Sequence, residues 1–255
     1  MKTITERHQF ILNKLQEKGK VSISQLIEEM NVSGVTIRKD LKLLEEKKLL
    51  FRTRGGGSIN NPYAVERPIN EKEFIKVDDK KKIAQAALAL IGQNDSIIIG
   101  SGTTLFEFSR VLYPDKRITV ITPALKVALE LCNRPNVEVL QLGGLVYQSS
   151  SSTAGSFAEK ILDELSCGVL FLGVDGIDLE HGLSITNIVE AGINQKMITL
   201  AQTVVVLADS SKFDRRGLGK ICNLNQVDYI ITDKEADPAT IEKIKKTGVR
   251  VIIAT

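Results

Sequence analysis

The first fifty residues carry apolar side chains at intervals of three and four positions, which is the spacing of amphipathic helices. This pattern predicts one helix that ends at Gly19, a second that begins near Ser22 or Ser24, and a third that is capped by Ser33. The apolar face of the third helix is expected at Val35, Ile37, Leu41, Leu44 and Leu49. About three residues separate the second helix from the third, as in a helix-turn-helix, whose second helix enters the major groove of DNA.

The polar positions at the start of the third helix suit contact with DNA. They are Ser33, Gly34, Thr36, Arg38 and Lys39. Hydroxyls and backbone N–H groups at a helix start bind phosphates, and an arginine can donate two hydrogen bonds to guanine. Gly34 leaves room for a close approach. We expect these residues, together with the helix-capping Ser22, to contact DNA.

A short basic hairpin is predicted directly after the third helix. Residues 49–53 form a strand in this interpretation, and the run from Gly55 to Gly57 forms a turn. Arg52, Arg54 and Gly55 then belong to a wing beside the helix-turn-helix, where the arginines can reach the DNA backbone. An ordinary flexible hairpin is the alternative, but two arginines next to a glycine tip behind a helix-turn-helix favour a wing.

From Asp78 onward, short apolar strands alternate with helical patterns. Strands are expected at 96–99, 118–122, 137–142, 169–174, 203–208, 229–232 and 249–254, and helices at 79–91, 104–112, 124–132, 155–165, 188–201 and 238–246. Several strands are continuous runs of Val, Ile and Leu, which indicates burial on both faces of a mostly parallel sheet. The predicted fold class is a winged helix-turn-helix at 1–57, a linker at 58–75, and a larger open α/β domain at 76–255.

The loop after the first strand of this sheet has the composition of an anion site. It contains Gly100, Ser101, Gly102, Thr103 and Thr104, and it precedes a helix. Glycines let backbone N–H groups converge, hydroxyls add donors, and the N-terminus of a helix favours negative charge, so we expect a phosphate here. The loop lacks the lysine of a P-loop and the spacing of a dinucleotide-binding loop, which disfavours ATP and NAD. A simple capped turn is the alternative.

Polar residues also follow three other strands, at the edge where ligands of open α/β sheets bind. They form the segments Gly143-Gly144, Asp175-Gly176-Ile177-Asp178 and Asp209-Ser210-Ser211-Lys212. Each aspartate taken singly could cap a turn, and Lys212 could be a solvated lysine. Together they predict a pocket for a phosphorylated polyol, in which Asp175 accepts hydrogen bonds from hydroxyls and Lys212 balances a charge. The serine run at 149–152 is expected to be a surface loop.

Charge divides the chain in the same way. Residues 1–57 hold 12 Lys and Arg against 7 Asp and Glu, whereas residues 58–255 hold 22 against 24. A basic segment joined to a slightly acidic one is expected of a nucleic-acid-binding module fused to a domain that does not bind polyanions. With no bilayer-length apolar run and no recognisable signal peptide, we expect a cytoplasmic protein without a membrane partner. Three scattered cysteines and two histidines support neither disulfides nor a metal site, and no cofactor is expected.

The N-terminal part resembles the winged helix-turn-helix of the DeoR family of bacterial transcriptional regulators. The resemblance runs over residues 6–58 and includes VSGVTIRKDL, the LE that follows, and the wing. The family's wing usually reads His-Gly-Gly-Ala, whereas this chain has Arg54-Gly55-Gly56-Gly57. The resemblance therefore implies DNA binding, but an operator sequence cannot be carried over from other members.

The larger domain also resembles the sensor domain of DeoR-family regulators, so the resemblance covers nearly the whole chain. The matching segments are GSGTT, LGG, VDGID, Glu190-Ala191 with Lys196 after it, and ADSSKF. The resemblance implies a fold similar to ribose-5-phosphate isomerase and a phosphorylated sugar as effector, with Gly144, Gly176 and Glu190 at its site. VDGIDLEHGLS and ADSSKFDRRGLGKI look most like regulators of N-acetylgalactosamine and related amino-sugar utilisation. Members often have Asp where Gly100 stands and Asn where Pro123 stands, which points to a different bound sugar.

Three functions follow from these observations. The first is a repressor of a sugar-utilisation operon, which binds double-stranded operator DNA as a dimer or tetramer and is released by a phosphorylated sugar. The second is a sugar-phosphate isomerase with an accessory DNA-binding domain, in which Asp175, Asp178, Glu190 and Lys212 move protons. The isomerase's Lys-Gly-Gly-Gly segment has no counterpart in the LEHG that follows Asp178, which favours a protein that is not an enzyme. The third is an activator or DNA-organising protein with a vestigial pocket.

Overall fold

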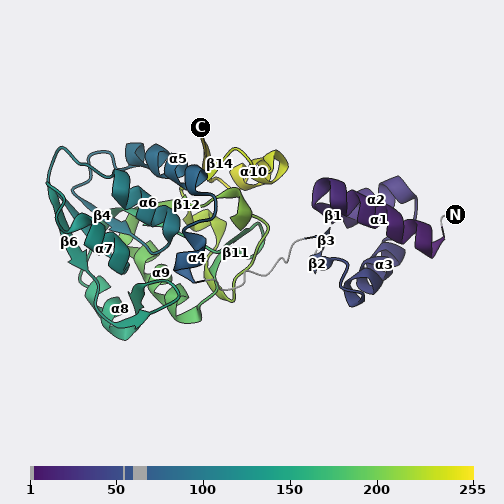
Figure 1. The fold of residues 1–255 in the computed structure, drawn as a ribbon, viewed down its shortest axis with the longest axis horizontal. Coiled ribbons are helices and arrows are strands. Elements are labelled where there is room, and N and C mark those ends of the chain that lie inside the picture. The colour runs from purple at the N-terminus through teal and green to yellow at the C-terminus, as the bar shows by residue number, and fades with distance from the viewer. Residues whose placement is uncertain (1–2, 54, 60–67) are drawn as a thin grey trace. The chain divides into compact units, whose positions relative to one another are not determined.

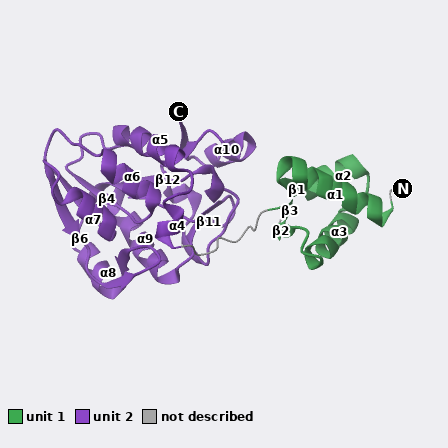
Figure 2. Ribbon diagram, viewed as in Figure 1, with its two compact units in different colours: residues 1–63 green, residues 64–255 purple. Residues whose placement is uncertain are grey.

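The chain forms two compact units, residues 1–63 and 64–255 (Figure 2). The computed structural model describes residues 3–53, 55–59 and 68–255. The division falls within the segment that the sequence marks as a linker. The last part of that segment, residues 68–75, packs within the larger unit and contains the short helix α4 (Ile69–Lys72). The composition of residues 68–75 does not indicate this packing, because many of the residues that they contact are distant in sequence.

The smaller unit contains three helices and a three-stranded sheet (Figure 1). Its elements are α1 (Ile4–Lys18), β1 (Lys20–Ser22), α2 (Ile23–Met30), α3 (Gly34–Glu46), β2 (Phe51–Thr53) and β3 (Gly56–Ser58). The predicted caps are present: Gly19 ends α1 with φ +70°, and the Ser22 and Ser33 hydroxyls accept hydrogen bonds from the backbone N–H groups of Gln25 and Thr36. Because the apolar faces converge, these helices share one buried core.

Two details of the smaller unit differ from the sequence prediction. Gly56 and Gly57 do not form a turn; they lie in β3, which pairs with both β1 and β2. A Cβ at Gly56 would lie 1.8 Å from the carbonyl oxygen of Val21, so the glycine is required by strand packing. Val35 and Leu49, expected on the buried face of the third helix, are 75% and 47% exposed. Val35 lies in the first turn of α3 and faces away from the core, and Leu49 lies beyond the end of the helix at Glu46, so the helical spacing does not apply to it.

The larger unit is built on a seven-stranded sheet in the order β15-β14-β12-β9-β4-β5-β6, and the pairings among these strands are parallel. The strands are β4 (Ser96–Ile99), β5 (Ile118–Thr122), β6 (Val137–Gln141), β9 (Cys167–Leu172), β12 (Ala201–Leu207), β14 (Tyr229–Asp233) and β15 (Arg250–Ala254). This confirms the predicted α/β class. The apolar runs of the central strands are buried on both faces because helices cover both, whereas the edge strands β6 and β15 are only partly buried.

Helices cover the two faces of this sheet in separate groups. One core cluster joins the sheet to α5 (Val77–Ala87), α6 (Thr103–Val111) and α7 (Leu125–Leu131); the other joins it to α8 (Ser156–Leu162), α9 (Ile188–Leu200) and α10 (Pro238–Lys245). Alternate residues of a strand point to opposite faces of the sheet, so Ile97 and Ile99 pack in the first cluster and Ile98 packs in the second. The result is a sheet whose carboxyl edge is framed by the loops that lead into these helices.

The order of the strands reverses at the centre of the sheet. From β4 the chain runs outward to β5 and β6, and it then returns to β9 on the other side of β4 before running outward again to β12, β14 and β15. The loops that leave β4 and β9 therefore run in opposite directions, and the edge of the sheet where they part is called the crevice here. This position is where open α/β sheets bind their ligands.

Several short elements were not predicted. They are the hairpin of β7 (Leu145–Tyr147) and β8 (Ser152–Ala154), the antiparallel sheet of β10 (Gly176–Asp178), β11 (Gly182–Ile185) and β13 (Gly219–Cys222), and the 3-10 turns at Leu88–Leu90, Ser210–Lys212 and Leu224–Gln226. Ser152, the last residue of the serine run expected as a surface loop, lies in β8 and is buried. Strands of three or four residues are too short for their alternation to be recognised.

Candidate functional site

The start of α3 gathers the side chains that the sequence assigns to DNA contact. Ser33 caps the helix, and its Oγ lies 2.9 Å from the Thr36 Oγ1. Arg38 and Lys39 are exposed on the following turn. A Cβ at Gly34 would lie 3.2 Å from the Arg38 Nη1, so the arginine extends back across the glycine. Ser33 thus contacts Thr36, and Gly34 contacts Arg38, at the start of α3, whereas Ser22 caps α2.

A buried ion pair fixes α3 against α1. The Arg7 Nε and Nη2 atoms donate to the two carboxylate oxygens of Asp40 at 2.7 and 3.0 Å. His8 Nε2 lies 3.3 Å from the same carboxylate. Asp40 is 2% exposed, although it lies in the middle of α3 beside a turn that faces solvent. This pair could not be predicted from the sequence, since nothing in the local pattern connects α1 with α3. The pair sets the angle at which the exposed turn is presented.

The wing is held against α3 at its base. The backbone N–H of Arg52 donates to the Glu45 Oε1 at 3.1 Å, and the exposed Arg52 guanidinium lies 3.9 Å from the Glu45 Oε2. The carbonyl of the exposed Gly55 accepts a hydrogen bond from Ile23 N at 2.7 Å. Arg54, the other wing arginine expected to contact DNA, lies outside the described residues.

In the larger unit, the predicted anion loop lies at the central crevice of the sheet. Gly100 N donates to the carbonyl of Phe171 in β9 at 2.9 Å, which ties the loop to the neighbouring strand. Gly102 has φ +127° and leads into α6, whose first turn has no side-chain cap. A Cβ at Gly173 would lie 2.7 Å from the carbonyl oxygen of Ser101, so the loops after β4 and β9 touch. The uncapped start of α6 presents backbone N–H groups to an anion.

Asp175 is a buried carboxylate at this edge with partners from two other segments. It is 8% exposed, and its Oδ2 accepts from the backbone N and the hydroxyl of Thr186 at 3.2 and 3.0 Å. Its Oδ1 accepts from the Lys72 Nζ at 2.9 Å. Burial opposes ionisation, but Lys72 and Lys212 outweigh it and hold the pKa of Asp175 below its usual value. The carboxylate is therefore ionised.

Two further lysines approach this region from different elements. Burial lowers the pKa of Lys212, and the carboxylates of Asp209 and Asp175 offset that effect only in part. Burial also lowers the pKa of Lys80, a residue of α5 that is 4% exposed. Asp209 caps the turn that carries Lys212 by accepting from Ser211 N at 3.0 Å, which is the structural role that the sequence left open for it.

Glu190 belongs to the same electrostatic group. It lies in the first turn of α9, is 4% exposed, and accepts a hydrogen bond from the Ser152 hydroxyl at 3.0 Å. Burial raises the pKa of Glu190, and hydrogen bonds from Ser150 and Ser152 oppose that shift. The negative charge of Asp175 raises the pKa of Glu190 further, and the positive charge of Lys72 lowers it, so Glu190 interacts electrostatically with both. The serine run thus contributes to the site.

The structure separates some predicted residues from the centre of the site. Gly176 packs against backbone, since a Cβ there would lie 2.4 Å from the Arg215 carbonyl oxygen. Asp178 accepts from two backbone N–H groups of its own turn and pairs with Arg216 at 2.8 Å. Gly144, with φ +136°, is required where the chain passes the carbonyl of Ala154. Lys72, Lys80 and Thr186 were missed: Lys72 lies 103 positions before its partner Asp175, and the contacts of Lys80 and Thr186 do not follow helix or strand spacing.

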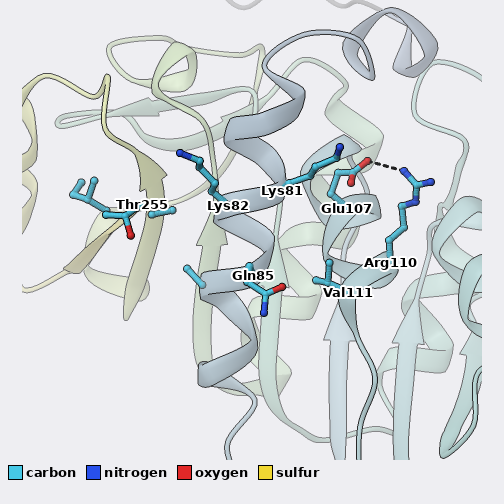
Figure 3. Close-up of a pocket in the computed structure, with 10 residues that line it drawn as sticks. Lys81, Lys82, Gln85, Glu107, Arg110, Val111 and Thr255 are labelled. Carbon is cyan, nitrogen blue, oxygen red and sulfur yellow. Dashed lines mark hydrogen bonds and ion pairs between the residues drawn. The ribbon is translucent and has the colours of Figure 1, made fainter.

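An open groove of about 710 Å³ lies elsewhere on this unit, between α5, α6 and the end of β15 (Figure 3). Figure 3 shows the Glu107–Arg110 ion pair at its rim, with an Nη1–Oε1 distance of 3.2 Å. Its lining residues are Lys81, Lys82, Gln85, Ala86, Glu107, Arg110, Val111, Ile253, Ala254 and Thr255. They include none of the residues that the sequence assigns to effector binding.

Asp79, Asp233 and Glu235 place carboxylate oxygens within 4.8 Å of one another, as a metal site would require. The Lys76 Nζ lies 3.3, 3.5 and 2.8 Å from their oxygens, respectively. The ammonium group takes the position that a cation would need and balances the charge, so we assign no metal to this cluster. Within the part of the chain that the structure describes, no helix is both long and apolar enough to cross a membrane.

Comparison with known proteins agrees with this organisation. The model of the DeoR-like helix-turn-helix domain matches residues 7–62, and that of the DeoR C-terminal sensor domain matches residues 75–234. A protein from Escherichia coli O157:H7, provisionally named as an aga operon transcriptional repressor, is 36% identical over 251 residues, or 98% of this chain and 93% of that protein. The HTH-type transcriptional regulator UlaR from Shigella dysenteriae serotype 1 is 30% identical over 98% of this chain and 99% of its own length.

A solved structure of ribose 5-phosphate isomerase A from Neisseria gonorrhoeae is similar over 52% of each chain, with 21% identity and a TM-score of 0.37, and that likeness concerns the fold alone. The matches to whole-length regulators decide between the functions that the sequence left open, in favour of a DNA-binding regulator over an enzyme. Both family models fall on the two units described above. This chain belongs to the DeoR family of helix-turn-helix transcriptional regulators.

Proposed function

We propose that this protein represses a sugar-utilisation operon in the cytoplasm and leaves its operator when a phosphorylated sugar binds to the larger unit. Residues 1–57 contact the DNA and residues 76–255 form the body of the effector domain. In this proposal Ser33, Gly34, Thr36, Arg38 and Lys39 contact the duplex. Ser22, Arg52, Arg54 and Gly55 support that contact at the wing side.

The observation that carries the proposal is the coincidence of three features at one crevice. The uncapped start of α6 after Gly102, the ionised Asp175 and the half-buried Lys212 follow the adjacent strands β4, β9 and β12, beside the point where strand order reverses. A phosphate suits the helix start, and hydroxyls suit the carboxylate. A phosphorylated sugar combines both groups in one molecule.

The remaining effector contacts follow from the same geometry. We assign phosphate contacts to Gly100, Ser101, Gly102, Thr103 and Thr104, and sugar contacts to Asp175, Glu190 and Lys212. Gly144 and Gly176 instead let the chain pass close to neighbouring backbone. The relative associated with the aga operon supports testing amino-hexose phosphates first. Gly100 and Pro123, where other members often carry Asp and Asn, are the positions at which sugar choice is expected to differ.

We further propose that the protein acts as a dimer or tetramer. Exposed apolar side chains lie on β7 and at the start of α8: Leu145 and Phe157 are each 72% exposed and Val146 is 58% exposed. Leu145 pairs with Ala154, three residues before Phe157, so these side chains lie on neighbouring elements. Such apolar surface favours association. Sedimentation velocity should show a species larger than 28.0 kDa, and Leu145→Lys should shift it toward the monomer.

A two-part experiment tests the function. Thermal unfolding of the full chain is measured against a panel of pentose, hexose and amino-hexose phosphates, with each unphosphorylated sugar as the matched control. Mobility shift then compares the promoter fragment of the neighbouring operon with random DNA at about 0.15 M salt. We expect a phosphosugar to raise the unfolding temperature and to release the promoter fragment. Promoter binding equal to that of random DNA, or stabilisation by no member of the panel, would contradict the proposal.

A further inference from the structure

The segment 68–76, called the strap here, is the first described part of the chain after residue 59, and it leads from the DNA-binding unit into α5. It is anchored to three loops of the larger unit. Ile69 is 5% exposed and its N–H donates to the Ser149 carbonyl at 2.8 Å. The Lys72 Nζ donates to the Asp175 Oδ1 at 2.9 Å, and the Lys76 Nζ to the Ser210 Oγ at 2.7 Å. The strap therefore crosses the edge where the effector residues lie.

A buried lysine holds the backbone of the strap. The Lys80 Nζ donates to the carbonyl oxygens of Lys72 and Ile75, each at 2.6 Å. On the outer side, the Lys126 ammonium pairs with the Glu73 carboxylate and contacts the Asn70 side chain at 3.2 Å. Because a buried cation is costly unless it is well hydrogen-bonded, Lys80 stabilises this conformation of the strap over others. The ammonium group of Lys72 is thereby held at the crevice.

The charges at the crevice favour an anionic ligand beside Lys72. Lys72 lowers the pKa of both Lys80 and Lys212, so the three ammonium groups are close enough to repel one another. Asp175 and Asp209 are the carboxylates that oppose this repulsion most directly. A dianionic phosphosugar would relieve it. An ammonium group has three donors, and the described structure shows one acceptor for Lys72, the carboxylate of Asp175.

We propose that the strap is a wall of the effector site and that Lys72 donates hydrogen bonds to the bound phosphosugar, so that effector binding acts directly on the segment leading to the DNA-binding unit. This inference rests on the proposed function. In this arrangement Lys72 keeps its ion pair with Asp175 and also donates a hydrogen bond to the effector. A ligand can shift a conformational equilibrium only through its different affinity for the two states. The Lys72 contact supplies that difference, because it forms only when the strap is docked.

The test uses the full chain and the panel member that stabilises the wild type most. Calorimetric titration of that compound compares wild type with Lys72→Met, Lys72→Arg and Lys126→Met. Lys72→Met keeps the apolar stem and removes the charge, Lys72→Arg restores the charge, and Lys126→Met loosens the strap from its outer side without touching the crevice. Thermal unfolding confirms that each variant is folded. Trypsin cleavage after Lys76, followed by mass spectrometry with and without the compound, reports docking of the strap.

We expect Lys72→Met to weaken phosphosugar binding at least tenfold and Lys72→Arg to restore it to within about threefold of wild type. Lys126→Met should weaken binding by an intermediate amount, about threefold, because a looser strap holds Lys72 at the crevice for less of the time. The compound should slow cleavage after Lys76 in wild type and Lys72→Arg but not in Lys72→Met. At saturating compound, Lys72→Met should keep hold of promoter DNA that the wild type releases. Unchanged affinity and release in a folded Lys72→Met would overturn the inference and leave the proposed function intact. Absence of any wild-type response to the panel would overturn both.

Discussion

Charged side chains are placed differently in the two units. At α3, Arg38 and Lys39 point into solvent, whereas in the larger unit Lys80 and Asp175 are 4% and 8% exposed and are held by several hydrogen bonds. Exposed cations attract DNA over a distance of about 10 Å, and salt screens that attraction. Buried charges act over short distances and are screened much less. The exposed charges of the smaller unit thus suit salt-dependent attraction to a polyanion, and the buried charges of the larger unit suit the selection of a small anion.

The Arg7–Asp40 pair differs from the exposed cations of the DNA-binding unit, because its carboxylate is buried. Its removal is expected to have the largest effect. Asp40→Ala leaves the Arg7 guanidinium without its buried partner, so we expect the smaller unit to lose about 3 kcal/mol of stability. Thermal unfolding followed by circular dichroism should show an earlier transition for this unit and an unchanged one for the larger unit. Lys42→Ala, at an exposed position of the same helix, is the control. A loss of less than about 1 kcal/mol would show that the pair does not fix α3.

The exposed cations of α3 should respond to salt. Arg38→Ala is expected to weaken operator binding by about 2 kcal/mol if the guanidinium contacts a base, and to lower the salt slope by about one unit if it contacts a phosphate. Fluorescence anisotropy between about 0.05 and 0.2 M salt distinguishes the two. Lys42→Ala again serves as the matched change, because Lys42 pairs with Glu46 one turn away. If Arg38→Ala and Lys42→Ala weakened operator binding equally, the first turns of α3 would not be the part of the helix that contacts DNA.

The anion loop can be tested through its backbone. Gly102 has φ +127°, a conformation that side chains rarely adopt, so Gly102→Ala should strain the loop by about 1 kcal/mol or more and weaken phosphosugar binding roughly tenfold. Gly143→Ala is the control, since Gly143 has an ordinary φ and open space around its Cα. Calorimetric titration measures the affinity. Full phosphosugar affinity in Gly102→Ala would contradict the anion site, and lost affinity in Gly143→Ala would mean that the control is itself part of it.

The smallest expected effect concerns the protonation of Glu190. Its pKa is raised in the folded state, so the contribution of its protonated form is present below the unfolded value near 4.5 and is lost as pH rises through the folded value. Glu190→Gln stays neutral and should gain stability relative to wild type as pH rises from 4 to 7, by about 2 °C in unfolding temperature. Scanning calorimetry at several pH values checks the slope. The opposite slope would place an unrecognised cation beside Glu190.

The helices of the smaller unit could be predicted from the sequence because their signals are local. Ser22, Ser33 and Gly19 each act within three or four positions of the groups they cap. The buried strands of the larger unit were also predictable, since both faces are covered and the apolar runs are unbroken. The order of those strands was not, because pairing is a property of the whole domain.

The contacts at the proposed effector site could be predicted only in part. The loop at Gly100 and the residues Asp175 and Lys212 carry polar types at strand ends, which is a recognisable signal. Lys72 lies 103 positions before Asp175, in a segment whose proline and charges are typical of a linker, so its role could not be inferred. Asp178 and Asp209 show the converse: their types suggested ligand contact, but their carboxylates accept backbone hydrogen bonds in their own turns.

The central claim is that occupancy of the crevice controls affinity for operator DNA, and one titration tests it most directly. Labelled promoter DNA is titrated with the full chain at about 0.15 M salt, with and without a saturating concentration of the panel phosphosugar that binds, and anisotropy gives both dissociation constants. The account predicts that the phosphosugar weakens promoter binding between about 5- and 150-fold, while the unphosphorylated sugar leaves it unchanged. Equal promoter affinity with the phosphosugar bound and absent would contradict it.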